Sequence, residues 1–551
     1  MKNSVWLLSG LGACWIGAAL AATDTLLSQS SIGEAGVNAL KLHNPPYRLT
    51  GRKIAIGQVE IGRPGQFGID KAVSRNRAFS SVRVFFRNTP AKTNANVDAH
   101  AQNVASIMVG NAKGFRGVAP DARLYASAVG ILKRNGQPEE CLSSQHIAQQ
   151  NGGDLRAINF SFGESLREDP RPQALLDGNA LLTQCIDWSS RVHDVLYIVA
   201  GNQGKGGIPI PTDQFNGMTI AFSTRLKNTA SSDPKLQKLG PYAKVDFANL
   251  GDPASGIPSR IIGLESNVGP RRSVSLLAPG NNVTVMNPDG RVVRTTGSSF
   301  AAPHVTASVA LLQEFGDRQL KARKLNWSLD SRRHEVMKAI LLNSAEKLQD
   351  QGNGLLLGMS RTILDKSNQD WLNSDAYRDR TIPLHIQMGA GQLNVFRAYQ
   401  QFQAGQYDPS TNVPAIGWDY RTVGSNSNNP KAPVYREYVI DRMLQKGSHV
   451  AITLAWDRRV DLKDTNRNGA YDLGEEFSDR GLNNLDVYLM RLDQTDTASS
   501  VWSSVSEVDS VEHLFHPIPQ TGRYKIRVVY QRQVNEPIQP YALAWWTVPI
   551  R

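Results

Sequence analysis

The sequence contains little cysteine, with 3 residues among 551. No Cys-x-x-Cys pair occurs, which leaves thiol redox and zinc-knuckle functions without support. The patterns Gly-x-x-x-x-Gly-Lys-Ser/Thr and Gly-x-Gly-x-x-Gly, which cradle nucleotide phosphates, are absent as well. The net charge is +12, but no dense Lys/Arg block with interleaved aromatic residues accompanies it. The charge therefore does not indicate nucleic-acid binding.

The composition that remains is that of a globular protein. Hydrophobic residues make up 40% and charged residues 20%, which excludes a disordered, collagen-like or multi-span membrane chain. A length of 551 residues exceeds what one compact core usually holds, so we expect two or more domains.

The first residues have the order of a secretion signal. Lys2 precedes an apolar run over residues 5–20, and Ala19-Leu20-Ala21 supplies a small-x-small end. We expect residues 1–21 to be a cleaved signal peptide; the alternative is an uncleaved anchor, because the run is nearly long enough to span a bilayer. Cleavage would give a secreted, periplasmic or extracellular protein with no transmembrane segment.

Two cysteines, Cys141 and Cys185, lie outside this predicted signal. An exported chain with an even cysteine count can form a disulfide, and the alternative is two buried free thiols. The sequence leaves both open.

Short apolar runs alternate with longer helical stretches between residues 51 and 403. The runs 54–59, 123–126, 157–160 and 195–199 have the pattern of buried strands, and 101–109 and 175–191 are compatible with helices. This alternation predicts an α/β fold, with a mainly parallel sheet covered by helices on both faces, in a domain at 22–404. Ligands of such sheets bind at the carboxyl ends of the strands.

The pattern changes near residue 435. The runs 450–456, 485–489 and 524–530 alternate and are rich in β-branched and aromatic residues, as in an antiparallel sandwich. We therefore expect a linker at 405–433 and a C-terminal β-sandwich domain at 434–551.

Three segments of the first domain carry groups suited to acyl transfer. The segment 296–304 places a serine at the start of an apolar helical run, 98–105 places a histidine where a helix starts, and 200–204 places an asparagine after a buried strand. Alone, the serine could be an ordinary N-cap. Together the three supply a nucleophile, a general base and an oxyanion donor.

With their surroundings, these segments resemble the subtilisin-like serine protease family. Gly297-Ser298-Ser299-Phe300-Ala301-Ala302-Pro303-His304 is similar to its nucleophile motif, and the segments beginning at 100, 117, 158, 200 and 389 match further motifs in the family's order over residues 50–400. The resemblance implies peptide-bond hydrolysis with the following residues: Ser299 as nucleophile, His100 as base, Asn202 as oxyanion donor, and Ser161, Phe162 and Gly163 in the substrate-binding strand.

The third member of the predicted triad departs from the family. The family's strand ends in Asp-x-Gly, whereas this one ends in Glu60-Ile61-Gly62. A glutamate can orient the imidazole if the backbone leaves room for one more methylene. We therefore expect a Ser299-His100-Glu60 triad; the alternatives are Asp98 as the acid, or a decayed site in a catalytically silent scaffold that binds at the cell surface.

A calcium-loop pattern lies in the second region. Residues 464–475 match D-x-[DN]-x-[DN]-G-x₅-E at every fixed position. The predicted ligands are Asp464, Asn466, Asn468, Ala470 through its carbonyl, Asp472 and Glu475. We expect a structural calcium ion between strands; the alternative is a polar turn.

Another metal motif is incomplete. His334-Glu335-Val336-Met337-Lys338 begins like the zinc-protease pattern His-Glu-x-x-His, but lysine occupies the second histidine position. We therefore expect a solvated helix face there. Taken together, the sequence predicts a secreted, monomeric serine endopeptidase that acts on polypeptides, binds calcium and does not bind nucleic acid.

Overall fold

The structure is a computed structural model. It describes residues 30–73, 81–132, 134–172, 174–202, 209–227, 239–247, 267–268, 270–424 and 434–550. The predicted signal peptide at 1–21 and residues 425–433 of the predicted linker lie outside the described residues.

A nine-stranded sheet forms the centre of the first domain in the described part of the chain. All of its pairings are parallel except those of β10 with β9 and of β2 with β3. In order across the sheet the strands are β10 (Leu239–Phe247), β9 (Met218–Lys227), β8 (Leu196–Ala200), β7 (Leu155–Phe160), β1 (Ala55–Glu60), β6 (Arg123–Ala128), β2 (Ser81–Phe86) and β3 (Thr89–Pro90), with β13 (Val274–Pro279) also paired to β9.

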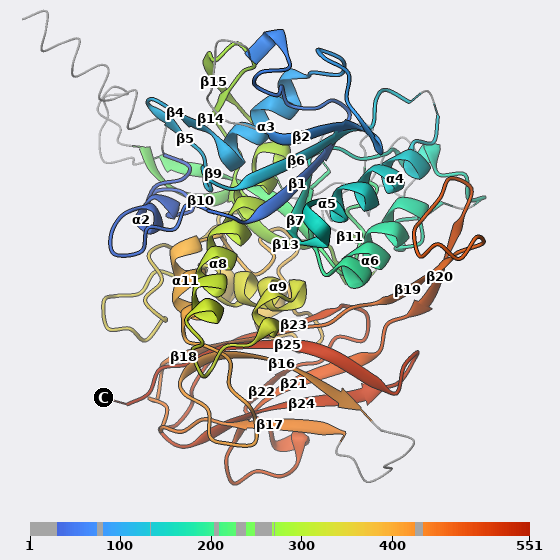
Figure 1. The fold of residues 1–551 in the computed structure, drawn as a ribbon. Coiled ribbons are helices and arrows are strands. Elements are labelled where there is room, and N and C mark those ends of the chain that lie inside the picture. Colours follow the sequence, from blue (N-terminus) through green and yellow to red (C-terminus); the bar gives the residue numbers. More distant parts are fainter. Residues whose placement is uncertain are drawn as a thin grey trace, which may run out of the picture.

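Helices cover both faces of this sheet (Figure 1). Helices α3 (Ala99–Val109) and α8 (Ala302–Lys321) share a core with Ile56 of β1, whereas α4 (Gln137–Ala148) and α6 (Leu181–His193) share one with its neighbour Ala55. Successive residues of a strand point to opposite faces, so an apolar strand serves both cores. The predicted α/β fold with helices on both faces is confirmed.

The first domain has further short elements. They are α2 (Ala39–His43), α5 (Gln150–Gly153), α9 (His334–Asn343), α10 (Asp375–Arg378), α11 (Val395–Gln403), and the strand pairs β4 (Asn111–Ala112) with β5 (Phe115–Arg116), β11 (Asn267–Val268) with β12 (Arg271–Arg272), and β14 (Val283–Met286) with β15 (Val292–Thr295). Within the described residues, no helix is both long and apolar enough to cross a bilayer.

Two four-stranded antiparallel sheets form the predicted C-terminal sandwich around a separate apolar core. The first has the order β16 (Ile416–Gly424), β25 (Ile538–Trp546), β18 (His449–Ala455), β23 (Val511–Pro517), and the second β17 (Tyr435–Val439), β24 (Tyr524–Arg532), β21 (Asn484–Arg491), β22 (Trp502–Ser504). Strand β16 falls inside the predicted linker at 405–433, yet pairs along its whole length with β25. The connecting segment is therefore shorter than the sequence indicated, because the Asn, Ser, Pro and Gly residues gather on either side of this strand.

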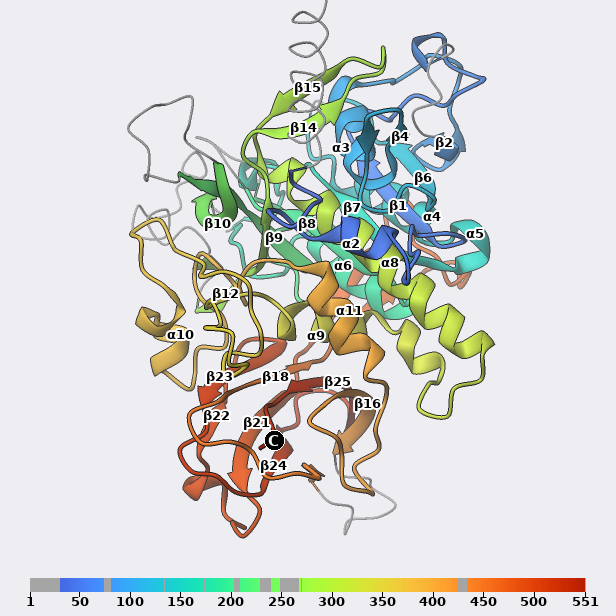
Figure 2. The ribbon, with the colours of Figure 1, turned by 90° about the vertical axis from the view of Figure 1, so that its left-hand side faces the viewer.

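The sandwich packs against the first domain through a buried interface. Helices α9 and α11 lie between the α/β sheet and the sheet that contains β16, β25 and β18 (Figure 2). Arg458 of the sandwich donates to Asp187 of α6 at 2.6 Å, and both side chains are almost fully buried. A buried ion pair that loses one partner is strongly destabilising, so we expect the two domains to fold as one unit.

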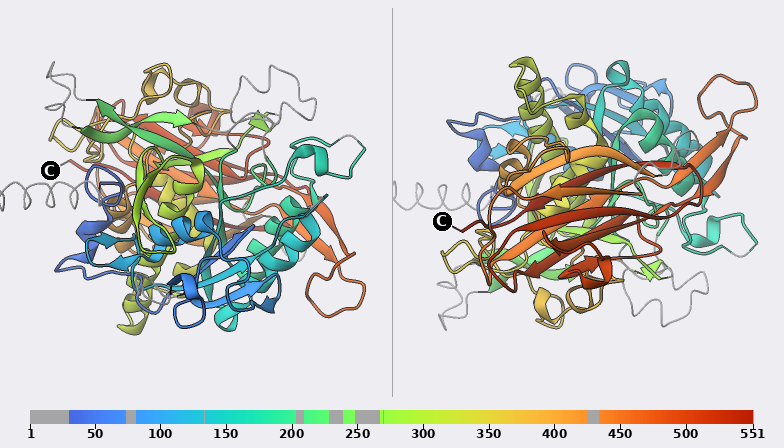
Figure 3. Two further views of the ribbon diagram at one scale, coloured as in Figure 1. Left: turned by 90° about the horizontal axis from the view of Figure 1, so that it is seen from above. Right: turned by 90° about the horizontal axis from the view of Figure 1, so that it is seen from below.

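A hairpin extends from the sandwich along one flank of the first domain. Strands β19 (Arg459–Lys463) and β20 (Glu476–Gly481) reach α4 and α6, as Figure 1 and both views of Figure 3 show. There Tyr471 and Phe477 pack with Cys141 and Cys185. These two cysteines form a disulfide that joins α4 to α6, which resolves the alternative left open by the sequence.

Helix α9 is buried rather than solvated. Its residues His334, Glu335 and Lys338 are each at most 5% exposed, so the predicted solvated helix face at 334–338 is wrong. The sandwich covers this polar face, and the carboxylate of Asp457, from the sandwich, lies against His334.

Candidate active site

Three of the predicted site residues lie at or just after the carboxyl ends of neighbouring strands of the sheet. Glu60 ends β1, Ser161 follows β7, and Asn202 lies two residues after β8. The strands are adjacent in the order β8, β7, β1 and run parallel. Their carboxyl ends therefore meet at one edge of the sheet, where such sheets bind ligands.

Glu60 and His100 are in contact. Glu60 Oε2 lies 3.4 Å from His100 Nδ1, with 3% of the glutamate side chain and 41% of the histidine side chain exposed. A Cβ at Gly62 would lie 2.2 Å from the Cβ of Asp98, so the glycine lets the end of β1 approach the start of α3 closely. The negative charge of Glu60 raises the pKa of His100 above its ordinary value, although burial opposes this.

Asp98 has a different task from Glu60. Its side chain caps α3 by accepting a hydrogen bond from the backbone N–H of Ala101 at 2.9 Å. Such a cap satisfies one of the free N–H groups of the first turn. This leaves Glu60 as the carboxylate that faces the His100 ring at hydrogen-bonding range.

Two glutamines fix the helix that carries His100. Gln58 of β1 donates to the carbonyl of Ala101 at 2.9 Å, and Gln102 accepts from the backbone N–H of Gly65 at 2.9 Å. Gln102 stands where the family motif has threonine. Its buried side chain anchors the segment that follows β1, which is a structural reason for this departure from the motif.

Ser299 lies on the 3₁₀ turn Ser298–Phe300, directly before α8. The ring of Phe300 packs 5.5 Å from the ring of His100, so the serine and histidine segments are brought together. Ser299 Oγ donates to the carbonyl of Ser161 at 3.1 Å. Among the hydrogen bonds of the described residues, none joins Ser299 to His100.

A buried polar chain supports the serine segment and was not predicted. Ser161 Oγ donates to the carbonyl of Ser299 at 3.0 Å, and Asn159 Nδ2 donates to Ser161 Oγ at 2.9 Å. Asn159 in turn accepts from Thr306 of α8. The signal available in the sequence was an asparagine inside an otherwise apolar strand, because buried polar groups need partners.

The segment with Asn202 is tied to the same place. Ser298 Oγ donates to the carbonyl of Gly201, and the N–H of Gly201 donates to Ile220 of β9 at 2.8 Å. The side chain of Asn202 is buried. The predicted oxyanion donor therefore lies beside the turn that carries the predicted nucleophile.

Among the predicted substrate-binding residues, Ser161 faces the site through its backbone, whereas the side chain of Phe162 lies in the core. The Ser161 carbonyl faces Ser299, whereas the Phe162 ring stacks on Phe160 at 5.1 Å and belongs to the core under α4 and α6. At 161–163, with the half-exposed Gly163, the groups available to a ligand are therefore mainly backbone N–H and carbonyl groups.

The segments that carry Ser299, His100 and the buried carboxylate of Glu60 thus lie near one another at the carboxyl edge of a parallel sheet, and serine hydrolases use these three kinds of group. The family model described as the subtilase family matches residues 51–359, more than half of the chain. The chain belongs to the subtilase family of serine proteases, as the motifs predicted.

Two curated relatives are each 25% identical to the matched part of this chain. An alkaline protease of Alkalihalobacillus alcalophilus is 25% identical over 297 residues, which cover 53% of this chain and 62% of the relative. Subtilisin Savinase of Lederbergia lenta is 25% identical over 285 residues, covering 51% and 83%. The chain thus spans less than two thirds of the alkaline protease. Among solved structures, the prenylagaramide maturation protease PagA is 19% identical with a TM-score of 0.39, covering 64% of this chain and 93% of that one.

The predicted calcium residues form the loop between β19 and β20. Asp464 accepts from the backbone N–H of Gly469 at 2.7 Å, and the amides of Asn466 and Asn468 both donate to Asp472 at 2.7 Å. Ala470 donates to Asn468 Oδ1 at 2.7 Å. Hydrogen bonds within the loop therefore bring its oxygen-bearing side chains close together.

Glu475 closes this loop. Its carboxylate accepts from the N–H of Thr465 at 2.7 Å and from that of Asp472 at 3.0 Å. These hydrogen bonds, from Asp472 first and then Thr465, lower its pKa. The donor set of carboxylates, amide oxygens and one backbone carbonyl fits calcium, which binds six to eight oxygen ligands.

Proposed function

We propose that this chain is an exported serine endopeptidase that hydrolyses peptide bonds through an acyl-enzyme on Ser299. His100 is the general base, and Glu60 orients its imidazole. Asn202 and the backbone N–H of Ser299 bind the oxyanion. The contact between Glu60 Oε2 and His100 Nδ1 at 3.4 Å carries the proposal, since it supports Glu60 as the third triad member in place of the family's aspartate.

The first chemical step requires a rotation of the Ser299 side chain. Its hydroxyl donates to the Ser161 carbonyl in the free protein and must turn to His100 Nε2. Catalytic hydrogen bonds often form fully only in the substrate complex. His100 then accepts the hydroxyl proton as Oγ attacks the peptide carbonyl, and the Glu60 carboxylate stabilises the resulting imidazolium.

The same groups complete the cycle. His100 gives its proton to the leaving amine when the tetrahedral intermediate collapses to the acyl-enzyme. A water molecule repeats the attack, with His100 again as the base. This step restores the free hydroxyl of Ser299 and releases the carboxylic acid product.

The test is labelling by a fluorophosphonate, which reacts with an activated serine. The probe should modify the purified chain at Ser299, as located by peptide mass spectrometry. Neither Ser299→Ala nor His100→Ala should be labelled. A folded, unlabelled wild-type chain contradicts the proposal.

One observation favours a second candidate, a catalytically silent scaffold that binds at the cell surface. The hydroxyl of Ser299 is held by the Ser161 carbonyl instead of His100. If this arrangement persisted with substrate, no proton could pass to the base. The scaffold therefore predicts neither probe labelling nor cleavage of peptide libraries, but retained binding of a polypeptide.

Export is supported by the predicted signal at 1–21 and by the disulfide between Cys141 and Cys185, because disulfides persist in oxidising compartments. Expression with this segment intact should release a monomeric protein whose amino terminus is residue 22. Cell-associated protein that keeps residues 1–21 contradicts this part of the proposal.

The loop at 464–475 is proposed to hold one structural calcium ion through Asp464, Asn466, Asn468, the Ala470 carbonyl, Asp472 and Glu475. The neighbouring Tyr471 exchanges two backbone hydrogen bonds with the side chain of Gln145 in α4. Calcium would therefore stiffen the contact between the hairpin and the first domain. It takes no part in the reaction.

Calorimetry tests the calcium site. We expect the purified chain to bind one calcium ion and to melt at a lower temperature after chelation, because a ligand bound only by the native state stabilises it. Asp464→Ala should lose both effects. No heat of binding together with an unchanged melting temperature excludes the site.

A further inference from the structure

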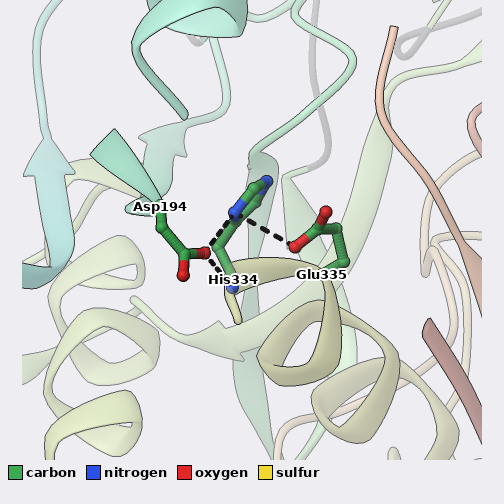
Figure 4. Close-up of side chains that lie close together, drawn as sticks. All are labelled: Asp194, His334 and Glu335. Carbon is green, nitrogen blue, oxygen red and sulfur yellow. Dashed lines mark hydrogen bonds and ion pairs between the residues drawn. The ribbon is translucent and has the colours of Figure 1, made fainter. Parts of the chain in front are cut away.

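A second polar cluster surrounds His334, the first residue of α9. Its Nδ1 lies 2.9 Å from Asp194 Oδ1 and 3.2 Å from Glu335 Oε2 (Figure 4). Its Nε2 lies 3.0 and 3.1 Å from the two carboxylate oxygens of Asp457. Asp194 follows α6, whereas Asp457 follows β18 of the sandwich, so the cluster joins both domains.

The cluster is away from the candidate active site. Asp194 precedes β8 (Leu196–Ala200), and Asn202 follows it. The length of the strand therefore separates the two, and the cluster lies at the amino edge of the sheet. The side chains of His334, Glu335 and Asp457 are only 2%, 7% and 7% exposed.

Three carboxylates share one imidazole in this cluster. Glu335 Oε2 is buried and, among the described residues, has no hydrogen-bond donor. Its ion-pair partner is His334 Nδ1, which Asp194 also uses. One ring proton therefore serves two carboxylate oxygens, and a buried negative charge without a partner is costly.

The other nearby cations pair with groups other than Glu335 Oε2. Arg333 lies 3.5 Å from the other oxygen of Asp194, and Lys338 donates to the carbonyl of Phe215 at 2.6 Å. Arg191 and Arg459 line the same cavity as His334, and both pair with Asp461. None of these contacts reaches Glu335 Oε2, so this buried oxygen has only the His334 ring as a cationic partner among the described residues.

We propose that Asp194, His334 and Glu335 bind a zinc ion. The three ligand atoms lie within 4.8 Å of one another. In a tetrahedral zinc site with bonds of about 2.0 Å, ligand atoms are roughly 3.3 Å apart. The observed 2.9 and 3.2 Å reach this value after shifts of a few tenths of an ångström. Zinc would replace the proton on Nδ1.

Asp194 is held in place for this role, because its Oδ1 also accepts from the backbone N–H of His334 at 3.0 Å. A cavity of about 370 Å³, lined in part by His334, Glu335 and Asp457, lies beside the cluster. It offers space for a water molecule as the fourth ligand.

Asp457 completes the site without binding the ion. Its carboxylate faces Nε2 of His334, so it would hold the remaining ring proton on Nε2 once zinc has replaced the proton on Nδ1. Carboxylate–histidine pairs of this kind support zinc sites generally. Because Asp457 comes from the sandwich, zinc binding depends on the docking of the two domains.

Metal analysis of the full chain tests the site. After chelation and dialysis against zinc, we expect one zinc per chain, and the cobalt-substituted chain should show the intense visible bands of tetrahedral cobalt. Less than stoichiometric zinc without these bands overturns the proposal. The cobalt spectrum requires no substitution, so the test does not depend on a variant that folds.

Substitutions then assign the ligands. Glu335→Gln should lower zinc affinity at least 100-fold, and Asp457→Asn about 10- to 100-fold. Asp461→Asn, which alters a carboxylate of the same interface outside the cluster, and Asp464→Ala in the calcium loop should both bind zinc as the wild type does. Equal affinity of Glu335→Gln and the wild type, or loss of zinc in Asp464→Ala, overturns the assignment.

Discussion

Replacing Glu60 with Gln removes one negative charge from the proposed triad and keeps the size of the side chain. At the 3.4 Å that separates Glu60 from His100, two unit charges attract by about 5 kcal/mol at an effective dielectric constant near 20, and by about 1 kcal/mol in bulk water. The His100 side chain is 41% exposed, which places the interaction between these limits. If Glu60→Gln removes about 3 kcal/mol of stabilisation from the imidazolium that forms in the transition state, kcat should fall about 10²-fold.

The assay is the hydrolysis of a peptide substrate, with kcat normalised to active serines counted by fluorophosphonate labelling. Asp98→Asn is the matched control, since Asp98 caps the same helix but does not face the His100 ring. It should change kcat by a few-fold at most. Glu60→Asp keeps the charge but shortens the side chain, so its kcat should lie between those of Glu60→Gln and the wild type.

Two results would refute this reasoning. Glu60→Gln with a wild-type kcat would show that the carboxylate plays no part in the reaction. A larger loss in Asp98→Asn than in Glu60→Gln would make Asp98 the acid of the triad.

Three further predictions concern the same domain. Asn202→Ala should lower kcat by roughly 10²–10³, the scale known for a subtilisin oxyanion donor; an unchanged kcat removes that role. His100 must be neutral to act as a base, so kcat/KM should rise with pH through its raised pKa. The pH–rate profile of Glu60→Gln should move this rise to lower pH, and an unmoved profile contradicts it. Replacing Cys141 and Cys185 by Ser, across a separation of 44 residues, should lower the free energy of unfolding by about 4 kcal/mol, measured in urea; a change below about 1 kcal/mol contradicts this.

Much of the first domain could be predicted from local pattern. The apolar run at 195–199 corresponds to β8 (Leu196–Ala200), and the helical stretch at 101–109 to α3 (Ala99–Val109). Buried parallel strands carry few polar residues, so they differ clearly from the helices between them. The meeting of Glu60, Ser161 and Asn202 then follows from the rule that ligands lie at the carboxyl ends of such strands.

The sequence could not reveal contacts between residues that are far apart in the chain. His334 lies 140 residues from Asp194 and 123 from Asp457, so its polar helix resembles a solvated one until the sandwich covers it. Strand β16 was not predicted because polar residues such as Asp419 interrupt its apolar residues. That carboxylate accepts from Tyr438 inside the sandwich.

Strand β25 has a consequence for how the protein is made. It is the last strand along the described residues, yet it lies between β16 and β18 in the sheet that covers α9. The surface that shields α9 from water therefore cannot form until residues 538–546 have emerged from the ribosome or the export channel. The proposed protease could therefore not complete its fold before β25 is available, which delays any cleavage inside the cell that makes it.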